Sequence, residues 1–254
     1  MPTLPAAFGR EFPMRAFCLV LLGALCVAPA SLHGQRQPTD PIRPLGTSRF
    51  AFGGALNYGR PVGDFYHYVE QGWGFDGFFR WNLEPQGIVS LRVEGGYLSY
   101  GRETKRVPLS STIGGRILVD LTTSNNIVWL GLGPQLTLPV PFLRPYINAS
   151  GGFSYFFTES SVEGSNNNEA FANTTNYDDG TWAWGVGGGF LIPFATRSGE
   201  VAIDLGARYH GNGEVRYLRE GSIIDVPDGN TIIIPIRSEA NLVTFRIGVS
   251  VSVR

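Results

Sequence analysis

The feature that most constrains this sequence is an alternation of apolar with polar or small residues, which recurs in eight segments after Ser48. In the first segment, Phe50, Phe52, Leu56 and Tyr58 stand at every second position, with Ala, Gly and Asn between them. A period of two residues indicates a β-strand with one apolar face. The pattern predicts an all-β fold with strands at 50–58, 73–82, 89–97, 128–138, 147–155, 182–190, 201–210 and 243–253.

The length of the segments matches the thickness of the apolar layer of a membrane. A strand of about ten residues that is tilted by about 45° rises roughly 23 Å. This height is close to the apolar band of a transmembrane barrel, which is about 25 Å tall. The repeat therefore predicts an eight-stranded antiparallel transmembrane β-barrel, an up-and-down meander.

The connections between the segments alternate in length, as expected for short periplasmic turns and long external loops. Short connections are predicted at Leu83–Gly87, Pro139–Pro145 and Phe194–Gly199, and long ones at Gly59–Gly72, Gly101–Asn126, Ser160–Gly180 and Leu218–Asn241. Two runs inside the long connections, Val107–Thr123 and Ile223–Ile236, resemble strands. They either extend hairpins above the membrane or make ten membrane strands. We favour eight, because ten strands break the alternation of short and long connections.

Composition is consistent with a surface that avoids water. Charged residues make up 16% of the chain, against about 25% in soluble domains. A lipocalin-like barrel or β-sandwich is the soluble alternative, and its apolar face would point inward. Aromatic residues near the strand ends favour a membrane barrel, where they form girdles at the two interfaces. The predicted girdle consists of Tyr58, Trp73, Trp81, Tyr97, Tyr155, Trp182 and Tyr209.

The N-terminus is typical of a cleaved signal peptide over residues 1–30. Arg15 precedes the apolar run Ala16–Val27, and Ala28-Pro29-Ala30 fits a signal-peptidase site. Translation starts at Met1 or Met14. Both cysteines, Cys18 and Cys26, lie in this segment, so the mature chain would lack disulfides and thiolate metal sites. Residues 31–47 are expected to form a periplasmic tail, and residues 48–254 the outer-membrane barrel.

The order of these features resembles a known family. After the signal peptide come Gly-rich aromatic strands, then Leu143-Arg144-Pro145-Tyr146 before a Gly-rich strand, then a terminal strand over Thr244–Val253. Over residues 48–254 the chain resembles the outer membrane protein β-barrel domain family, which is similar to small barrels of the OmpA and OmpX type. The resemblance implies the bacterial outer membrane as location, and outer-membrane lipid and the barrel-assembly machinery as partners.

The face opposite the apolar one carries charges that are expected to point into the lumen. Eight strands leave a lumen that side chains fill, and buried charges must be paired. We therefore predict a stabilising lumenal network, with a narrow small-solute channel as the alternative. Its predicted members are Asp76, Arg80, Arg92, Glu94, Asp204, Arg208 and Arg246.

No constellation in the sequence indicates catalysis or a cofactor. His67 lies in a loop, and His210 is interpreted as a polar residue at the barrel rim. A lipid-modifying barrel enzyme near His210 is the less favoured alternative, because no nucleophile–base–orienter set is visible. Acidic turns such as Tyr177-Asp178-Asp179 are explained by turn preferences, so no metal site is predicted.

The predicted function is a non-enzymatic structural or surface-interaction role. The net charge of −1 gives no electrostatic reason to expect a nucleic-acid partner. The polar stretches Ser165–Asn168 and Asn173–Asn176 are expected in an external loop. Such loops are places where an extracellular ligand can bind.

Overall fold

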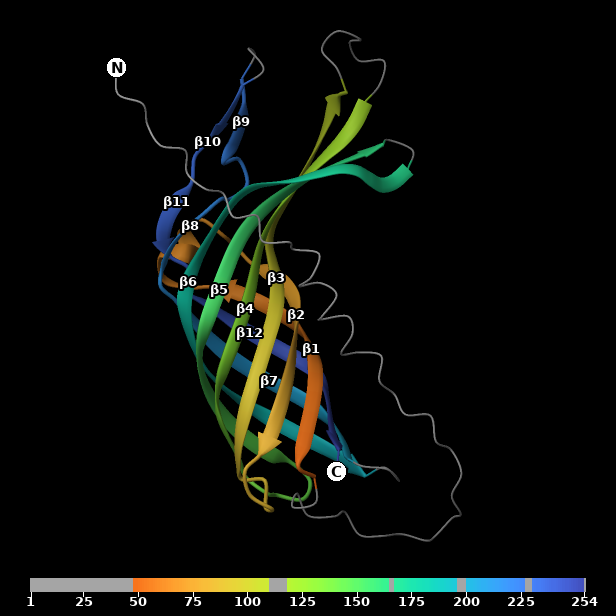
Figure 1. Cartoon of the computed structure of the whole chain (residues 1–254), viewed down its shortest axis with the longest axis vertical. Coiled ribbons are helices and arrows are strands. Elements are labelled where there is room, and N and C mark those ends of the chain that lie inside the picture. Colours follow the sequence, from red (N-terminus) through yellow and green to blue (C-terminus); the bar gives the residue numbers. More distant parts are fainter. Residues whose placement is uncertain (1–47, 110–117, 165–166, 196–199, 227–229, 254) are drawn as a thin grey trace, which may run out of the picture. The chain divides into compact units, whose positions relative to one another are not determined.

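A computed structural model describes residues 48–253, apart from 110–117, 165–166, 196–199 and 227–229 (Figure 1). The predicted signal peptide, the whole predicted periplasmic tail and both cysteines lie outside these residues. No helix in the described ranges is long and apolar enough to cross a membrane.

Eight strands form one closed antiparallel barrel, in which each strand pairs with the next and the last pairs with the first. The closing pair runs in register from Phe50 opposite Val253 to Pro61 opposite Leu242. The predicted eight-stranded up-and-down meander is therefore confirmed. The barrel strands are β1 (Phe50–Pro61), β2 (Gly72–Asn82), β3 (Val89–Pro108), β4 (Leu118–Thr137), β5 (Arg144–Gly164), β6 (Asn167–Ala195), β7 (Glu200–Asn212) and β12 (Leu242–Val253).

Four consecutive strands are much longer than the ten residues predicted, since β3 to β6 have between 20 and 29 residues each. The prediction of loops over Gly101–Asn126 and Ser160–Gly180 is therefore wrong over most of both ranges. Pairing continues because polar side chains bond across the strands, as between the hydroxyls of Thr104 and Thr122 at 3.0 Å. Figure 1 shows these strands extending past the other four. We call the extensions the strand arms, at 101–108, 118–125, 158–164 and 167–177.

The remaining connections contain short elements. The first holds a 3-10 helix, η2 (Gly63–His67). After β7, β8 (Glu214–Tyr217) pairs with β11 (Ile236–Glu239), and β9 (Ile223–Asp225) pairs with β10 (Thr231–Ile233). The run over Ile223–Ile236 thus forms small separate sheets, and the ten-strand alternative is wrong.

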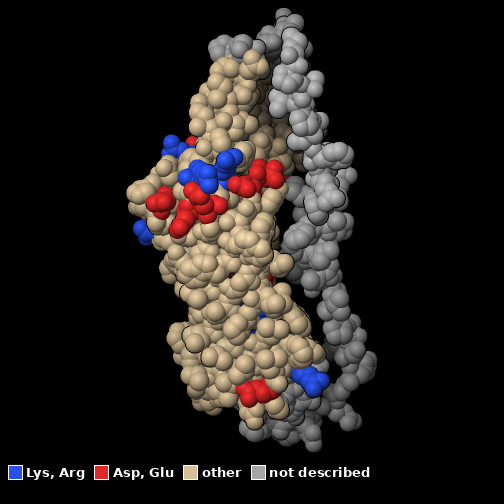
Figure 2. Space-filling model, turned by 60° about the vertical axis from the view of Figure 1, so that its left-hand side comes forward, with Lys and Arg blue, Asp and Glu red and all other residues tan. Residues whose placement is uncertain are grey.

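The apolar face of the barrel points outward. Trp182, Leu56 and Trp73 are 81%, 69% and 63% exposed, whereas the charged residues between the apolar positions are buried. Figure 2 shows the result as a broad band with almost no charge, with charged residues gathered beyond it. A soluble barrel would bury this face, so the lipocalin-like alternative is wrong. We call the outward apolar surface of the eight strands the apolar belt.

A second apolar region lies inside the barrel toward the strand arms. Phe65 of η2 packs edge-on against Tyr100 and Tyr217, at ring-centroid distances of 5.4 and 5.0 Å. Phe156 and Ile127 complete the same buried group from β5 and β4. We call this group the apolar cap; its members are Phe65, Val69, Leu98, Tyr100, Ile127, Trp129, Phe156, Val215, Tyr217, Ala240 and Leu242.

Candidate functional site

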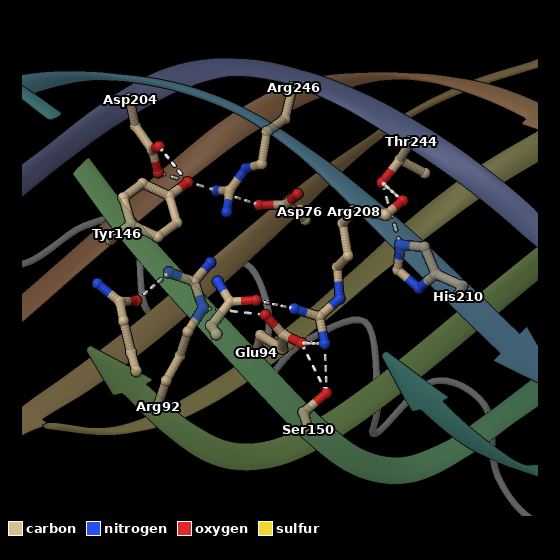
Figure 3. A network of polar contacts seen from close by, with 12 residues as sticks. Asp76, Arg92, Glu94, Tyr146, Ser150, Asp204, Arg208, His210, Thr244 and Arg246 are labelled. Atoms are coloured by element: carbon tan, nitrogen blue, oxygen red, sulfur yellow. Dashed lines mark hydrogen bonds and ion pairs between the residues drawn. The ribbon is translucent and has the colours of Figure 1, made fainter. Parts of the chain in front are cut away.

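The lumen below the apolar cap contains a connected set of charged side chains from β2, β3, β7 and β12 (Figure 3). Arg246 lies 2.8 Å from Asp76 and 3.3 Å from Asp204, which makes it the bridge between two carboxylates. The Tyr146 hydroxyl donates to the other oxygen of Asp204 at 2.7 Å. Each carboxylate thus receives charge compensation in a space from which water is largely excluded.

Glu94 organises the second half of the network. Arg92 Nε lies 2.9 Å from one Glu94 oxygen, and the Ser150 hydroxyl donates to the other at 2.9 Å. Arg208 pairs with the same carboxylate and donates to Asn148 Oδ1 at 2.5 Å. Six of the seven sequence-predicted lumenal charges therefore lie in ion pairs, and Arg80 is the seventh.

Arg80 is buried, with 3% exposure, but forms no ion pair within the described part of the chain. Its direct neighbour across the β2–β3 register is Arg92, which carries the same charge. Arg92 is itself directed elsewhere: it stacks 3.9 Å over the Phe78 ring and donates to Gln135 at 3.0 Å. Among the residues that the structure describes, Arg80 is thus the member of the predicted network that lies outside the ion pairs.

Sequence reasoning missed a further buried ion pair, Arg144 with Glu200, between β5 and β7. Arg144 is 2% exposed and also donates to the Val140 carbonyl at 3.3 Å. The sequence pattern places it in the short connection Pro139–Pro145, whereas β5 begins at Arg144. The alternation could have indicated it, since Arg144, Tyr146 and Asn148 share the inward parity of β5.

The interpretation of His210 as a rim residue is wrong. His210 is 8% exposed, lies 3.0 Å from the Thr244 hydroxyl through Nε2, and packs against Trp129 at a ring-centroid distance of 5.1 Å. The His210 side chain lies inside the barrel because β4, β5 and β6 continue past it and the apolar cap covers it. His67, by contrast, is exposed at the end of η2.

One small cavity borders the lumenal charge network. A cavity of about 10 Å³ lies beside Glu94, Ser150, Arg208 and His210, and this volume is enough for about one water molecule. Among the described residues, no group of three or more His, Cys, Asp or Glu side chains is placed to hold a metal ion. The arrangement therefore offers charge pairing rather than room for a substrate.

The seven predicted girdle residues all lie on the outward face. Tyr58 contacts Trp73 at a ring-centroid distance of 4.8 Å, and Trp182 contacts Phe153 at 6.3 Å. Six of the seven lie toward the strand arms, whereas Trp81 lies at the other end of β2, paired in register with Phe50. Their role at a membrane interface stays a prediction.

No protein-family model and no curated protein matches the sequence. Among solved structures, the chain is similar to the attachment invasion locus protein Ail of Yersinia pestis, with a TM-score of 0.42, 11% identity, and 80% of this chain and 97% of that one covered. Neisserial surface protein A is similar with a TM-score of 0.40 and 13% identity, over 80% of this chain and 97% of that one. The N-terminal β-barrel domain of OprF from Pseudomonas aeruginosa has a TM-score of 0.32 and 14% identity, over 81% of this chain and 98% of that one. The barrel assignment rests on the strand pairing described above.

Proposed function

We propose that this protein is a bacterial outer-membrane barrel with a sealed lumen, which holds its strand arms on the cell exterior as an interaction surface and catalyses no reaction. The observation that carries the proposal is the inversion of polarity, with apolar residues outside the barrel and paired charges inside it. In water this arrangement would expose a large apolar area, whereas lipid accommodates it.

The sealed lumen supports an interaction role over a channel. A conducting barrel needs a continuous water-filled path. Here Arg92, Glu94, Arg208 and Arg246 occupy the lumen, and the apolar cap lies between them and the strand arms. The free space beside this network is about 10 Å³.

The geometry around His210 favours a structural role over lipid modification. Its hydroxyl partner Thr244 is 2% exposed, so an acyl chain outside the barrel has no access to the pair. The His210 ring packs against Trp129, which belongs to the apolar cap.

The strand arms have the chemistry of a water-facing surface. Arg106 forms a two-point pair with Asp120 across β3 and β4, at 2.8 and 3.0 Å. These hydrogen bonds from Arg106 lower the pKa of Asp120. The paired charges keep the hairpin extended beyond the apolar belt, where a partner could reach it.

Conductance tests this proposal. Purified barrel reconstituted in a planar lipid bilayer is expected to be electrically silent at moderate voltage, because the charge network and the apolar cap block the path. A porin in the same bilayer is the positive control. Reproducible conductance steps whose size changes in Arg92→Ala or Arg246→Ala would favour the channel alternative and contradict a sealed lumen.

A further inference from the structure

A groove of about 220 Å³ lies on the lumen-facing side of the strand arms, further along the strands than the apolar cap. Residues of β3, β4, β5 and β6 form its floor, and the turn between β8 and β9 forms one wall. The groove is separate from the charge network, with which it shares no residue.

The floor is a single cross-strand row of polar side chains. The strand register aligns Glu103 with Thr123, Thr123 with Ser160, and Ser160 with Thr174. The Thr123 and Ser160 hydroxyls lie 2.8 Å apart, and Asn176 Nδ2 donates to Ser160 at 2.6 Å. Side chains that already bond to one another are held in position before a ligand arrives.

Two irregularities in strand pairing orient this row. The register shifts between Ser99 and Gly101 on β3, so that Glu103 and Lys105 face inward although the inward residues lower on β3 have even numbers. A second shift, opposite Thr158 and Glu159, leaves Asn176 unpaired on β6 and directed at Ser160. Bulges commonly redirect side chains in this way at binding sites.

The wall of the groove is anchored to β3. The Tyr100 hydroxyl donates to the Leu218 carbonyl at 3.1 Å, and the Arg102 backbone N–H donates to Glu220 Oε1 at 3.1 Å. The turn is closed at Gly221, whose φ of 77° is a conformation that glycine adopts without strain. Arg219 and Glu220 therefore line the groove from a turn that is held against β3.

The lining indicates the chemical class of the ligand. Two cations, Lys105 and Arg219, are balanced by two anions, Glu103 and Glu220, so the groove has no net preference for a charged molecule. Hydroxyl and amide groups on the floor both donate and accept hydrogen bonds, as the hydroxyls of a sugar do. Two aliphatic side chains, Leu121 and Ile223, offer contact for a C–H face.

The groove is large enough for a small polar molecule. Its volume of about 220 Å³ is many times that of the cavity beside Glu94, which at about 10 Å³ has room for about one water molecule. An extended peptide fits less well, because the backbone groups of the floor are already paired between neighbouring strands.

We propose that this groove binds a single neutral sugar residue, either free or at the end of a glycan. The inference deepens the proposed surface-interaction function and rests on it, because a cell-surface glycan reaches the groove only if the strand arms are outside the cell. Thr123 and Ser160 contact the sugar hydroxyls from the floor, and Arg219 and Glu220 contact them from the wall.

Saturation-transfer NMR tests the proposal with the full chain folded in lauryldimethylamine oxide, a detergent without a sugar headgroup. The probes are methyl glycosides of glucose, galactose and N-acetylglucosamine at about 20 mM, well above a Kd on the order of 1 mM. We expect transfer to at least one of them. Thr123→Val should weaken binding about tenfold, since it removes a floor hydroxyl and keeps the side-chain shape.

The matched control is Thr122→Val, at the adjacent position on the opposite face of β4. It also removes one inter-strand hydroxyl contact, that with Thr104, and is expected to leave the affinity within about twofold. Thr174→Trp, at an exposed position, fills the groove and should abolish transfer. Altered gel mobility without boiling reports whether each variant is folded. If either Thr123→Val or Thr174→Trp fails to fold, the other still tests the groove.

The proposal is overturned if no neutral sugar shows transfer, or if Thr123→Val and Thr174→Trp bind as well as Thr122→Val. It is also overturned if only sucrose octasulfate or trialanine binds, since these represent an anionic sugar and a peptide. A barrel that fractionates with the outer membrane but binds no sugar leaves the proposed function standing. Sugar binding by a protein found outside that membrane supports the groove and contradicts the location.

Discussion

At the scale of single residues, the buried guanidinium groups differ in their compensation. Arg246 lies between Asp76 and Asp204, whereas Arg80 has no acidic partner within the described residues. Removing one member of a buried ion pair leaves the other charge uncompensated, which costs about 3–5 kcal/mol. Removing a buried charge that has no partner relieves a desolvation cost.

The two arginines are therefore predicted to respond in opposite ways to a neutral side chain of similar length. Arg246→Met should lower the free energy of unfolding by about 3–5 kcal/mol, and Arg80→Met should leave it unchanged or raise it by about 1 kcal/mol. Urea unfolding of the barrel in lipid vesicles measures both values. Equal losses in the two variants would mean that Arg80 has a partner equivalent to Asp76 and Asp204.

At the scale of elements, η2 is a short helix that closes the lumen. Phe65 is fully buried among Tyr100, Phe156 and Tyr217, while its neighbour Tyr66 is 54% exposed. One helical turn thus inserts a single ring into the barrel and directs the next one to solvent.

This contrast predicts a large difference between adjacent substitutions. Phe65→Ala should lower the free energy of unfolding by about 3–5 kcal/mol, because it leaves a cavity among aromatic rings. Tyr66→Ala should change it by less than about 0.5 kcal/mol. Chemical denaturation of the two variants gives the comparison, and a similar loss in both would contradict the packing of the apolar cap.

The strand arms extend past the apolar belt, so the barrel is predicted to fold without one of them. Joining Ser161 to Asn173, which face each other across β5 and β6, through an Asn-Gly turn should retain a folded barrel. Removing the paired residues Ser154–Tyr155 and Gly180–Thr181 instead shortens the belt and should impair folding. Gel mobility without boiling distinguishes the two. Loss of the folded form in the first variant would show that the arm is structurally essential.

At the scale of the whole molecule, the period-two pattern was sufficient to predict the closed meander and its inward charges, because alternation sets which face each residue occupies. For the strand arms it predicted only a hairpin extension over Val107–Thr123, which the pairing of β3 with β4 confirms in the described residues. It did not predict the arm of β5 and β6, where polar residues occupy both faces and the contrast that marks a strand disappears. The bulge after Ser99 also changes the inward parity of β3. Arg144 was missed because β5 begins three residues before the predicted strand, and His210 was misjudged because neighbouring strands continue past it.

The apolar cap could have been found from the sequence. Leu98 and Tyr100 on β3, and Ile127 and Trp129 on β4, are apolar residues at inward positions, where most of the other barrel positions are polar or small. On β4 the outward neighbours Val128 and Leu130 are also apolar, and a strand that is apolar on both faces indicates a segment buried on both sides. The groove could not be predicted, because it depends on pairing registers and on a turn from a distant part of the chain.

The central claim is that this is a folded barrel in the bacterial outer membrane, and one measurement tests it most directly. Outer-membrane fractions from cells that express the protein are run on a denaturing gel with and without boiling. We predict that the protein is found in this fraction and that its mobility changes only after boiling, because a paired, closed barrel resists detergent until it is heated. A freely soluble protein with the same mobility in both samples would contradict the account.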